Sequence, residues 1–64
     1  MHELLAKSDR PLGICLRMLY GEGMPRLDLR SEINDKGKME FHVLLSVDDE
    51  MFERLQKRFE TMIG

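Results

Sequence analysis

Alternation of apolar and polar side chains is the clearest pattern in this chain, and it covers residues 27–47. Apolar side chains alternate with mainly polar ones over 27–33 and again over 39–47, which is the two-residue period of a β-strand with one buried face. The segment 34–38 between them reads Asn-Asp-Lys-Gly-Lys. Asn and Asp favour turns, and Gly37 can supply a positive φ. The pattern predicts an antiparallel hairpin, with Leu44 as an apolar exception on its polar face.

A helix is predicted to begin after Ser8–Asp9 and to end at the glycines of residues 21–23. Ser and Asp are good N-caps, and Pro11 is tolerated in a first turn because its missing N–H has no helical partner there. Apolar side chains then recur at three- and four-residue steps and define one helix face: Leu12, Cys15, Leu16, Leu19 and Tyr20. Gly23 can adopt the left-handed C-cap conformation. Gly13 weakens the helix by about 1 kcal/mol relative to Ala, which favours a packing or ligand contact as its reason.

A second amphipathic helix is predicted after Asp48. Asp48 can cap it, acidic residues 49–50 favour its positive end, and basic residues 57–58 lie towards the other end. Its apolar stripe consists of Met51, Phe52, Leu55, Phe59, Met62 and Ile63.

Residues 2–7 are predicted to form a short strand, which gives the order strand, helix, strand, strand, helix. This order predicts an α+β, ferredoxin-like split β-α-β fold with an antiparallel hairpin, both helices on one face, and the last strand missing. Segments 2–7 and 27–33 then lie at the two edges of the sheet. The expected core consists of Leu16, Leu19, Phe41, Val43, Leu45, Leu55 and Phe59.

Composition indicates one soluble domain over residues 1–64, with 42% apolar and 34% charged residues. No apolar run approaches the roughly 20 residues of a membrane-spanning helix, and no signal-peptide pattern is found, so we expect a cytoplasmic protein with no membrane partner. The net charge is −2, and basic side chains alternate with acidic ones, which disfavours nucleic-acid binding. Because Cys15 alone cannot form an internal disulfide, a domain this small is expected to depend on association.

Groups that could carry chemistry are few and scattered. The candidate nucleophiles, bases and soft metal ligands are His2, Cys15 and His42. We expect His42 to be a solvated cross-strand neighbour and Cys15 to be a small buried apolar residue. Acidic residues 48–50 lack calcium-loop spacing, and Gly21–Gly23 closes a helix where a phosphate loop would open one. The chain is therefore predicted to have no catalytic activity, no metal and no cofactor.

The chain resembles the ACT domain. The resemblance rests on Asp9-Arg10-Pro11-Leu12-Gly13, then Leu16-Arg17-Met18-Leu19, and then Gly23-Met24. That family opens its first helix after a strand with a motif like Asp-Arg-Pro-Gly, and a leucine-rich helix follows and ends at a glycine. With the two alternating strands and the closing helix, the resemblance covers nearly the whole chain. It is strongest to the short regulatory small subunit of acetohydroxyacid (acetolactate) synthase.

The resemblance implies a non-catalytic regulatory subunit of branched-chain amino-acid biosynthesis. Such a domain forms a homodimer, stabilises a separate catalytic subunit and binds a small amino acid between its subunits. The implied effector-binding residues are Asp9, Pro11, Gly13, Gly23 and Met24. Binding to the partner subunit is expected ahead of amino-acid binding. The alternative is a free-standing protein-interaction adaptor with no small-molecule effector, and titration with isoleucine, leucine or valine separates the two.

Self-association is expected at a sheet edge, because an outer strand keeps unpaired N–H and C=O groups. Opposite charges alternate over residues 26–32, so this strand is self-complementary when it pairs antiparallel with its own copy. Such pairing is two-fold and closed, and it predicts a homodimer. The expected interface residues are Leu27, Leu29, Arg30 and Ile33.

Overall fold

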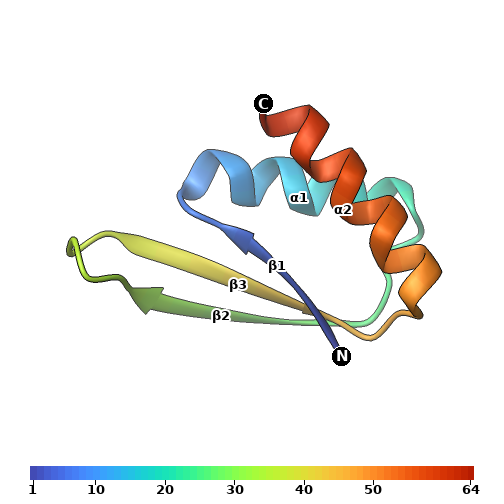
Figure 1. Cartoon of the computed structure of the whole chain (residues 1–64), viewed down its shortest axis with the longest axis horizontal. Coiled ribbons are helices and arrows are strands. Elements are labelled where there is room, and N and C mark those ends of the chain that lie inside the picture. The colour runs from blue at the N-terminus through green and yellow to red at the C-terminus, as the bar shows by residue number, and fades with distance from the viewer.

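The computed structural model describes residues 1–64, and its elements follow the predicted order (Figure 1). Their bounds are β1 His2–Ala6, α1 Asp9–Gly21, β2 Leu27–Ile33, β3 Met39–Leu45 and α2 Asp49–Ile63. The α+β, ferredoxin-like fold without a last strand is confirmed. Two strands are shorter than predicted, because β1 stops before Lys7 and β3 stops before Ser46.

The three strands form one sheet in the order β1-β3-β2, and both pairings are antiparallel. The predicted edge positions of β1 and β2 are therefore confirmed. Directly opposed residues share a face of the sheet, so the register assigns the faces. Leu4 and Leu29 flank Val43 on one face, whereas Leu5 and Arg30 flank His42 on the other.

The hairpin turn is closed by its own residue types. The Asn34 side-chain oxygen accepts hydrogen bonds from the backbone N–H groups of Lys36 and Lys38, at 2.9 and 3.0 Å. The Asn34 N–H donates to the Lys38 carbonyl at 2.8 Å. Gly37 has φ 76°, the left-handed conformation for which glycine was expected here. The predicted turn over 34–38 is confirmed.

Helix α1 ends in a Schellman motif. Gly23 has φ 87°, and its N–H donates to the Tyr20 carbonyl at 3.1 Å. The next N–H, of Met24, donates to the Leu19 carbonyl at 2.8 Å. These two bonds satisfy carbonyls that a helix end otherwise leaves unpaired. At the other end Ser8 occupies the N-cap position, but its side chain makes no capping bond.

The start of α2 is fixed by its cap and by β1. The Asp48 carboxylate accepts a hydrogen bond from the Met51 N–H at 2.7 Å, as the sequence predicts. The His2 ring stacks on Phe52, with ring centroids 4.3 Å apart. The Nε2 atom of His2 lies 2.8 Å from Asp49 Oδ1. Neither helix is long and apolar enough to cross a membrane.

The core lies between the helices and the central strand. It consists of Leu4, Ala6, Cys15, Met18, Leu19, Val43, Leu45, Leu55 and Phe59. The predicted core residues Leu16 and Phe41 are only half-buried. Tyr20, predicted on the apolar face of α1, is 78% exposed. At about 100° per residue, Tyr20 lies roughly 140° around the helix from buried Cys15, so the buried face points away from it.

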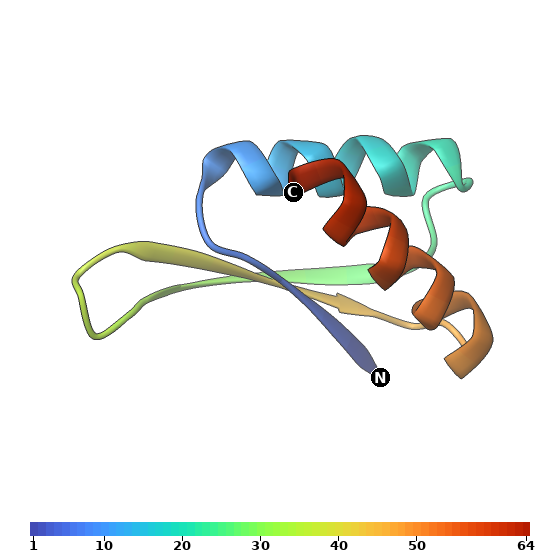
Figure 2. The ribbon, with the colours of Figure 1, turned by 45° about the horizontal axis from the view of Figure 1, so that its top comes forward.

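Both helices lie on one face of the sheet and leave the other face open (Figure 2). They pack mainly against each other and against β1. The expected cover over the apolar face of the hairpin is therefore incomplete along β2. Leu29 is 48% exposed and Ile33 is 69% exposed. Met39, which is paired with Ile33, is 45% exposed.

Candidate functional site

The two outer strands are the main unpaired surfaces of the molecule. Both β1 and β2 pair with β3 on one side only. On its other side each strand presents backbone N–H and C=O groups with no ladder partner, and a strand from another chain can hydrogen-bond to such groups. The candidate site is thus a pair of sheet edges, of which β2 also carries exposed apolar side chains.

All four predicted interface residues lie on β2, on its two faces. Leu27 is half-buried at the start of the strand, and the exposure of Leu29 and Ile33 increases towards the turn. These three side chains share the helix-side face, because they are opposite Leu45, Val43 and Met39. Arg30 is opposite His42 and lies on the open face. The structure brings the four residues together on one edge.

The open face carries a polar contact that crosses all three strands. His42 Nδ1 lies 2.7 Å from Glu3 Oε1 on β1, and its Nε2 lies 3.5 Å from Glu32 Oε2 on β2. His42 is a cross-strand neighbour, as predicted, but its side chain is half-buried between the two glutamates, so the expectation that it is solvated is wrong. Leu44 lies on this face, half-buried, as does Leu5, which is 39% exposed. This arrangement links the strands and forms no enclosed site.

The five predicted effector-binding residues do not form one site within a single chain. Asp9 begins α1, and Pro11 and Gly13 follow in its first turns, whereas Gly23 and Met24 come after its end. Helix α1 has 13 residues, so the two groups are roughly 20 Å apart at 1.5 Å per residue. An amino acid cannot contact both groups of one protomer.

Two positions in these groups have unusual local geometry. A Cβ at Gly13 would meet nothing within 4 Å, so packing within the chain does not require this glycine. Met24 has φ 49°, a left-handed conformation that costs a residue with a side chain about 1–2 kcal/mol. Such strain tends to occur at functional sites. The Met24 conformation was not predicted, although the place of this residue between Gly23 and Pro25 is a local signal.

Glu22 joins the end of α1 to α2, and this contact was not predicted either. Its carboxylate oxygens lie 3.0 Å from Arg54 Nη2 and 2.7 Å from Arg58 Nη1. The two arginines are four residues apart and so share one helix face. This four-residue spacing is the sequence signal that could have indicated an acidic partner for the two arginines. The contact joins the C-cap residue of α1 to α2.

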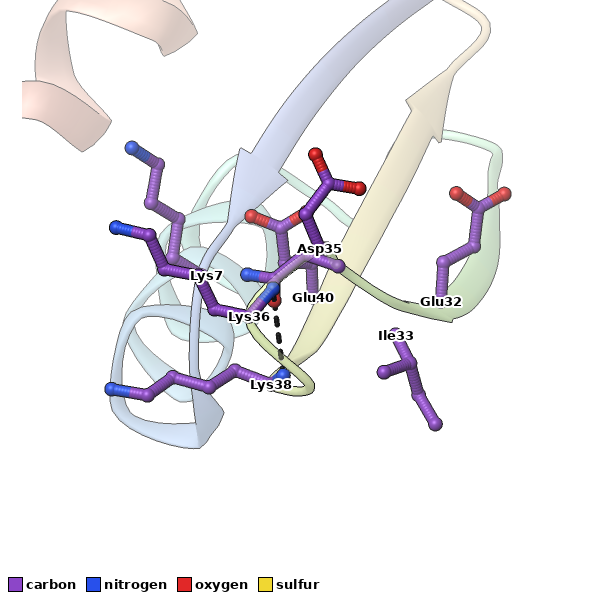
Figure 3. Close-up of a pocket in the computed structure, with 8 residues that line it drawn as sticks. Lys7, Glu32, Ile33, Asp35, Lys36, Lys38 and Glu40 are labelled. Carbon is purple, nitrogen blue, oxygen red and sulfur yellow. Dashed lines mark hydrogen bonds between the residues drawn. The ribbon is translucent and has the colours of Figure 1, made fainter.

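One hollow lies at the tip of the hairpin, and it is polar and open (Figure 3). The side chains of Lys7, Lys36 and Lys38 point the same way there. The other lining residues are Glu32, Ile33, Asn34, Asp35 and Glu40. Three lysines against three acidic side chains leave no net charge to favour an anion.

Cys15 is fully buried in the core, as predicted. Burial raises the pKa of its thiol from 9.0 to about 11, because the apolar surroundings disfavour the thiolate. The thiolate is the nucleophilic and metal-binding form. Cys15 is therefore a packing residue in this fold.

No three metal-ligating side chains gather at one place in the structure. Comparison with family models, with curated proteins and with solved structures gives no match. The candidate site consists of two sheet edges, the exposed apolar residues Leu29 and Ile33 on β2, and the strained backbone at Met24 after α1.

Proposed function

We propose that this chain is a non-catalytic regulatory domain of the ACT type, which dimerises and binds a separate catalytic subunit. The observation that carries the proposal is the unpaired edge of β2 with its exposed apolar residues Leu29 and Ile33. Residues of this kind at an edge are typical of a surface that another chain covers. A domain of 64 residues also gains stability when association buries more of its surface.

The separation of the effector groups supports binding of an amino acid between two copies. When β2 pairs antiparallel with its own copy, the Ile33 end of one strand lies beside the Leu27 end of the other. Helix α1 starts at the Ile33 end of the sheet and finishes at the Leu27 end (Figure 1). The Asp9–Gly13 group of one chain then lies at the same end of the dimer as the Gly23–Met24 group of its partner. The effector in this proposal is a branched-chain amino acid.

A second candidate is a protein-interaction adaptor with no small-molecule effector. One observation favours it: the only hollow in the structure is open and polar and lies at the hairpin tip. An apolar amino-acid side chain needs an enclosed apolar pocket. In this candidate both sheet edges bind proteins.

Amino-acid titration separates the two candidates. Isoleucine, leucine and valine are added in turn to the labelled protein, and amide chemical shifts are followed by NMR. The regulatory proposal expects saturable shifts at Gly13 and Gly23. Gly13→Ala is expected to abolish them, because the added methyl blocks approach to the backbone. Gly21→Ala, at another open helix position, is the control and keeps them. Absence of shifts with all three amino acids would favour the adaptor.

Binding to the catalytic subunit is tested directly. The purified chain is added to the acetohydroxyacid synthase catalytic subunit of the same organism, and turnover and co-sedimentation are measured. We expect a higher turnover and a complex of larger mass. If the two proteins sediment separately and turnover does not change, the regulatory proposal fails for this enzyme.

A further inference from the structure

We infer that two copies of this chain join their β2 strands antiparallel, in a register whose two-fold axis passes through Leu29. This inference rests on the proposed function, because it states how its dimer forms. The result is a continuous six-stranded sheet with all helices on one side.

The direction of the backbone groups on β2 supports this pairing. The Ser46 N–H donates to the Arg26 carbonyl at 2.9 Å, and the Asn34 N–H donates to the Lys38 carbonyl at 2.8 Å. The β2–β3 register is unbroken between these bonds, so even-numbered residues of β2 direct their N–H and C=O groups towards β3. The groups of the odd-numbered residues point outwards from the edge. These residues are Leu27, Leu29, Ser31 and Ile33.

The charges on the open face select the register. With the axis at Leu29, Arg26 of one chain is opposite Glu32 of the other, and Asp28 is opposite Arg30. Symmetry doubles both pairs, which gives four contacts between opposite charges. Cross-strand pairs of this kind stabilise a sheet. Within one chain, Arg26, Asp28 and Arg30 make no ion pair, so their charges remain available for the partner.

Neighbouring registers oppose like charges. An axis at Arg30 places Asp28 opposite Glu32, and an axis at Asp28 places Arg26 opposite Arg30. An axis at Ser31 keeps only the Arg30–Glu32 pairs and places Arg26 opposite Lys36. Like charges directly opposite each other are destabilising. The Leu29 register is the one in which all four charged residues of 26–32 face an opposite charge, so it is selected.

The apolar face fits the same register. Leu29 is 48% exposed, and the two copies of this side chain meet at the axis. Ile33, which is 69% exposed, lies opposite Pro25 of the other chain. Because the helices pack mainly on each other and on β1, they leave room over β2. The edge is short, so we expect a dimer with micromolar dissociation.

Charge reversal at Asp28 and Arg30 tests the register. Each side chain is exposed, and neither takes part in an ion pair within the chain. Asp28→Arg places a second guanidinium opposite Arg30, and Arg30→Asp places two acidic side chains opposite each other, so each variant alone is expected to be monomeric. When the two variants are mixed, one strand of the heterodimer has basic side chains at positions 28 and 30 and the other has acidic ones. Both contacts between these positions then pair opposite charges. They are expected to form a heterodimer.

Sedimentation equilibrium at micromolar concentration measures the outcome. The unmodified chain should give about twice its mass of 7.5 kDa, each variant alone should give the single mass, and their mixture should again give the double mass. Far-UV circular dichroism confirms that the variants fold. Dimers of either single variant, or a mixture that stays monomeric, would overturn the inference.

The proposed function can fail separately. The monomeric Asp28→Arg variant is also tested for binding to the catalytic subunit. A dimer with the predicted charge dependence but no binding to that subunit would leave this inference standing and refute the regulatory proposal. A chain that is monomeric to millimolar concentration and still binds the subunit would refute this inference and the dimer of the proposed function, and would leave binding to the catalytic subunit standing.

Discussion

Gly13 lies inside a helix where no neighbour requires a glycine. A Cβ there would be in open space, and Ala is favoured over Gly in a helix interior by about 1 kcal/mol. Gly13→Ala is therefore expected to raise the free energy of unfolding by about 1 kcal/mol, as measured by urea denaturation. The proposed function expects the same substitution to abolish amino-acid binding. A loss of stability would contradict the open environment of this residue.

Cys15 makes stability depend on pH in the alkaline range. Its thiol pKa is about 11 in the folded chain against 9.0 as the ordinary value, so folding favours the neutral thiol. This contribution is complete below about pH 9 and is lost as the pH rises to about 11, because the unfolded chain then releases the proton more readily. Two pKa units correspond to about 2–3 kcal/mol.

Cys15→Ala isolates this contribution, because the variant lacks the thiol and keeps every other side chain. We expect the difference in unfolding free energy between the chain and the variant to change by about 2–3 kcal/mol from about pH 8 to about pH 11. Urea denaturation at several pH values measures it. Parallel pH profiles for the two proteins would show that the thiol does not titrate as expected.

The periodic pattern predicts burial correctly where the apolar stripe of an element faces the core. Val43, Leu45 and Leu55 are buried as expected. Tyr20 is exposed. Steps of three and four residues give only an approximate direction for the apolar stripe of α1, so the pattern does not show where the buried face is centred. The Glu22 contacts with Arg54 and Arg58 depend on how two helices cross, which no local pattern determines.

Phe59 anchors α2 to the rest of the molecule. It is 3% exposed and belongs to the core together with Leu55. Phe59→Ala removes a buried aromatic ring and is expected to cost about 3–5 kcal/mol. That is comparable with the whole stability of so small a domain, so the variant should be unfolded by circular dichroism. Phe52→Ala, at a half-buried position, is the control and should stay folded.

Proline scanning distinguishes the two sides of β2. Leu29→Pro removes an N–H that points outwards, so the chain keeps its bonds to β3, whereas Arg30→Pro removes an N–H that points towards β3. We expect Leu29→Pro to fold as a monomer and Arg30→Pro to lose stability. Sedimentation and circular dichroism measure the two effects. A dimeric Leu29→Pro would show that β2 is not the interface.

The elements themselves were predictable because each carries its own signals. The bounds of β2 were predicted in full, and the turn at 34–38 follows from Asn34 and Gly37. The predicted strands 2–7 and 39–47 extend past the observed ends at Ala6 and Leu45. Alternation of apolar and polar residues continues after these strands end, so periodicity alone overestimates strand length.

For the whole molecule, strand order followed from topology, since a β-α-β unit with a hairpin leaves few arrangements. The exposure of β2 did not follow, because it depends on where the helices lie. The candidate effector residues were chosen by resemblance, and their separation along α1 became clear only in three dimensions. A sequence of one chain does not contain the geometry of a site shared between two.

The alternating backbone direction on β2 has a consequence for amide hydrogen exchange. In a monomer, the amides of Asp28, Arg30 and Glu32 are bonded to β3 and should exchange slowly, whereas those of Leu27, Leu29 and Ser31 face solvent and should exchange fast. Dimerisation should slow this second set only. Exchange followed by NMR at low and high protein concentration would then show protection that appears at every second residue of one strand, so each amide of β2 reports either folding or association.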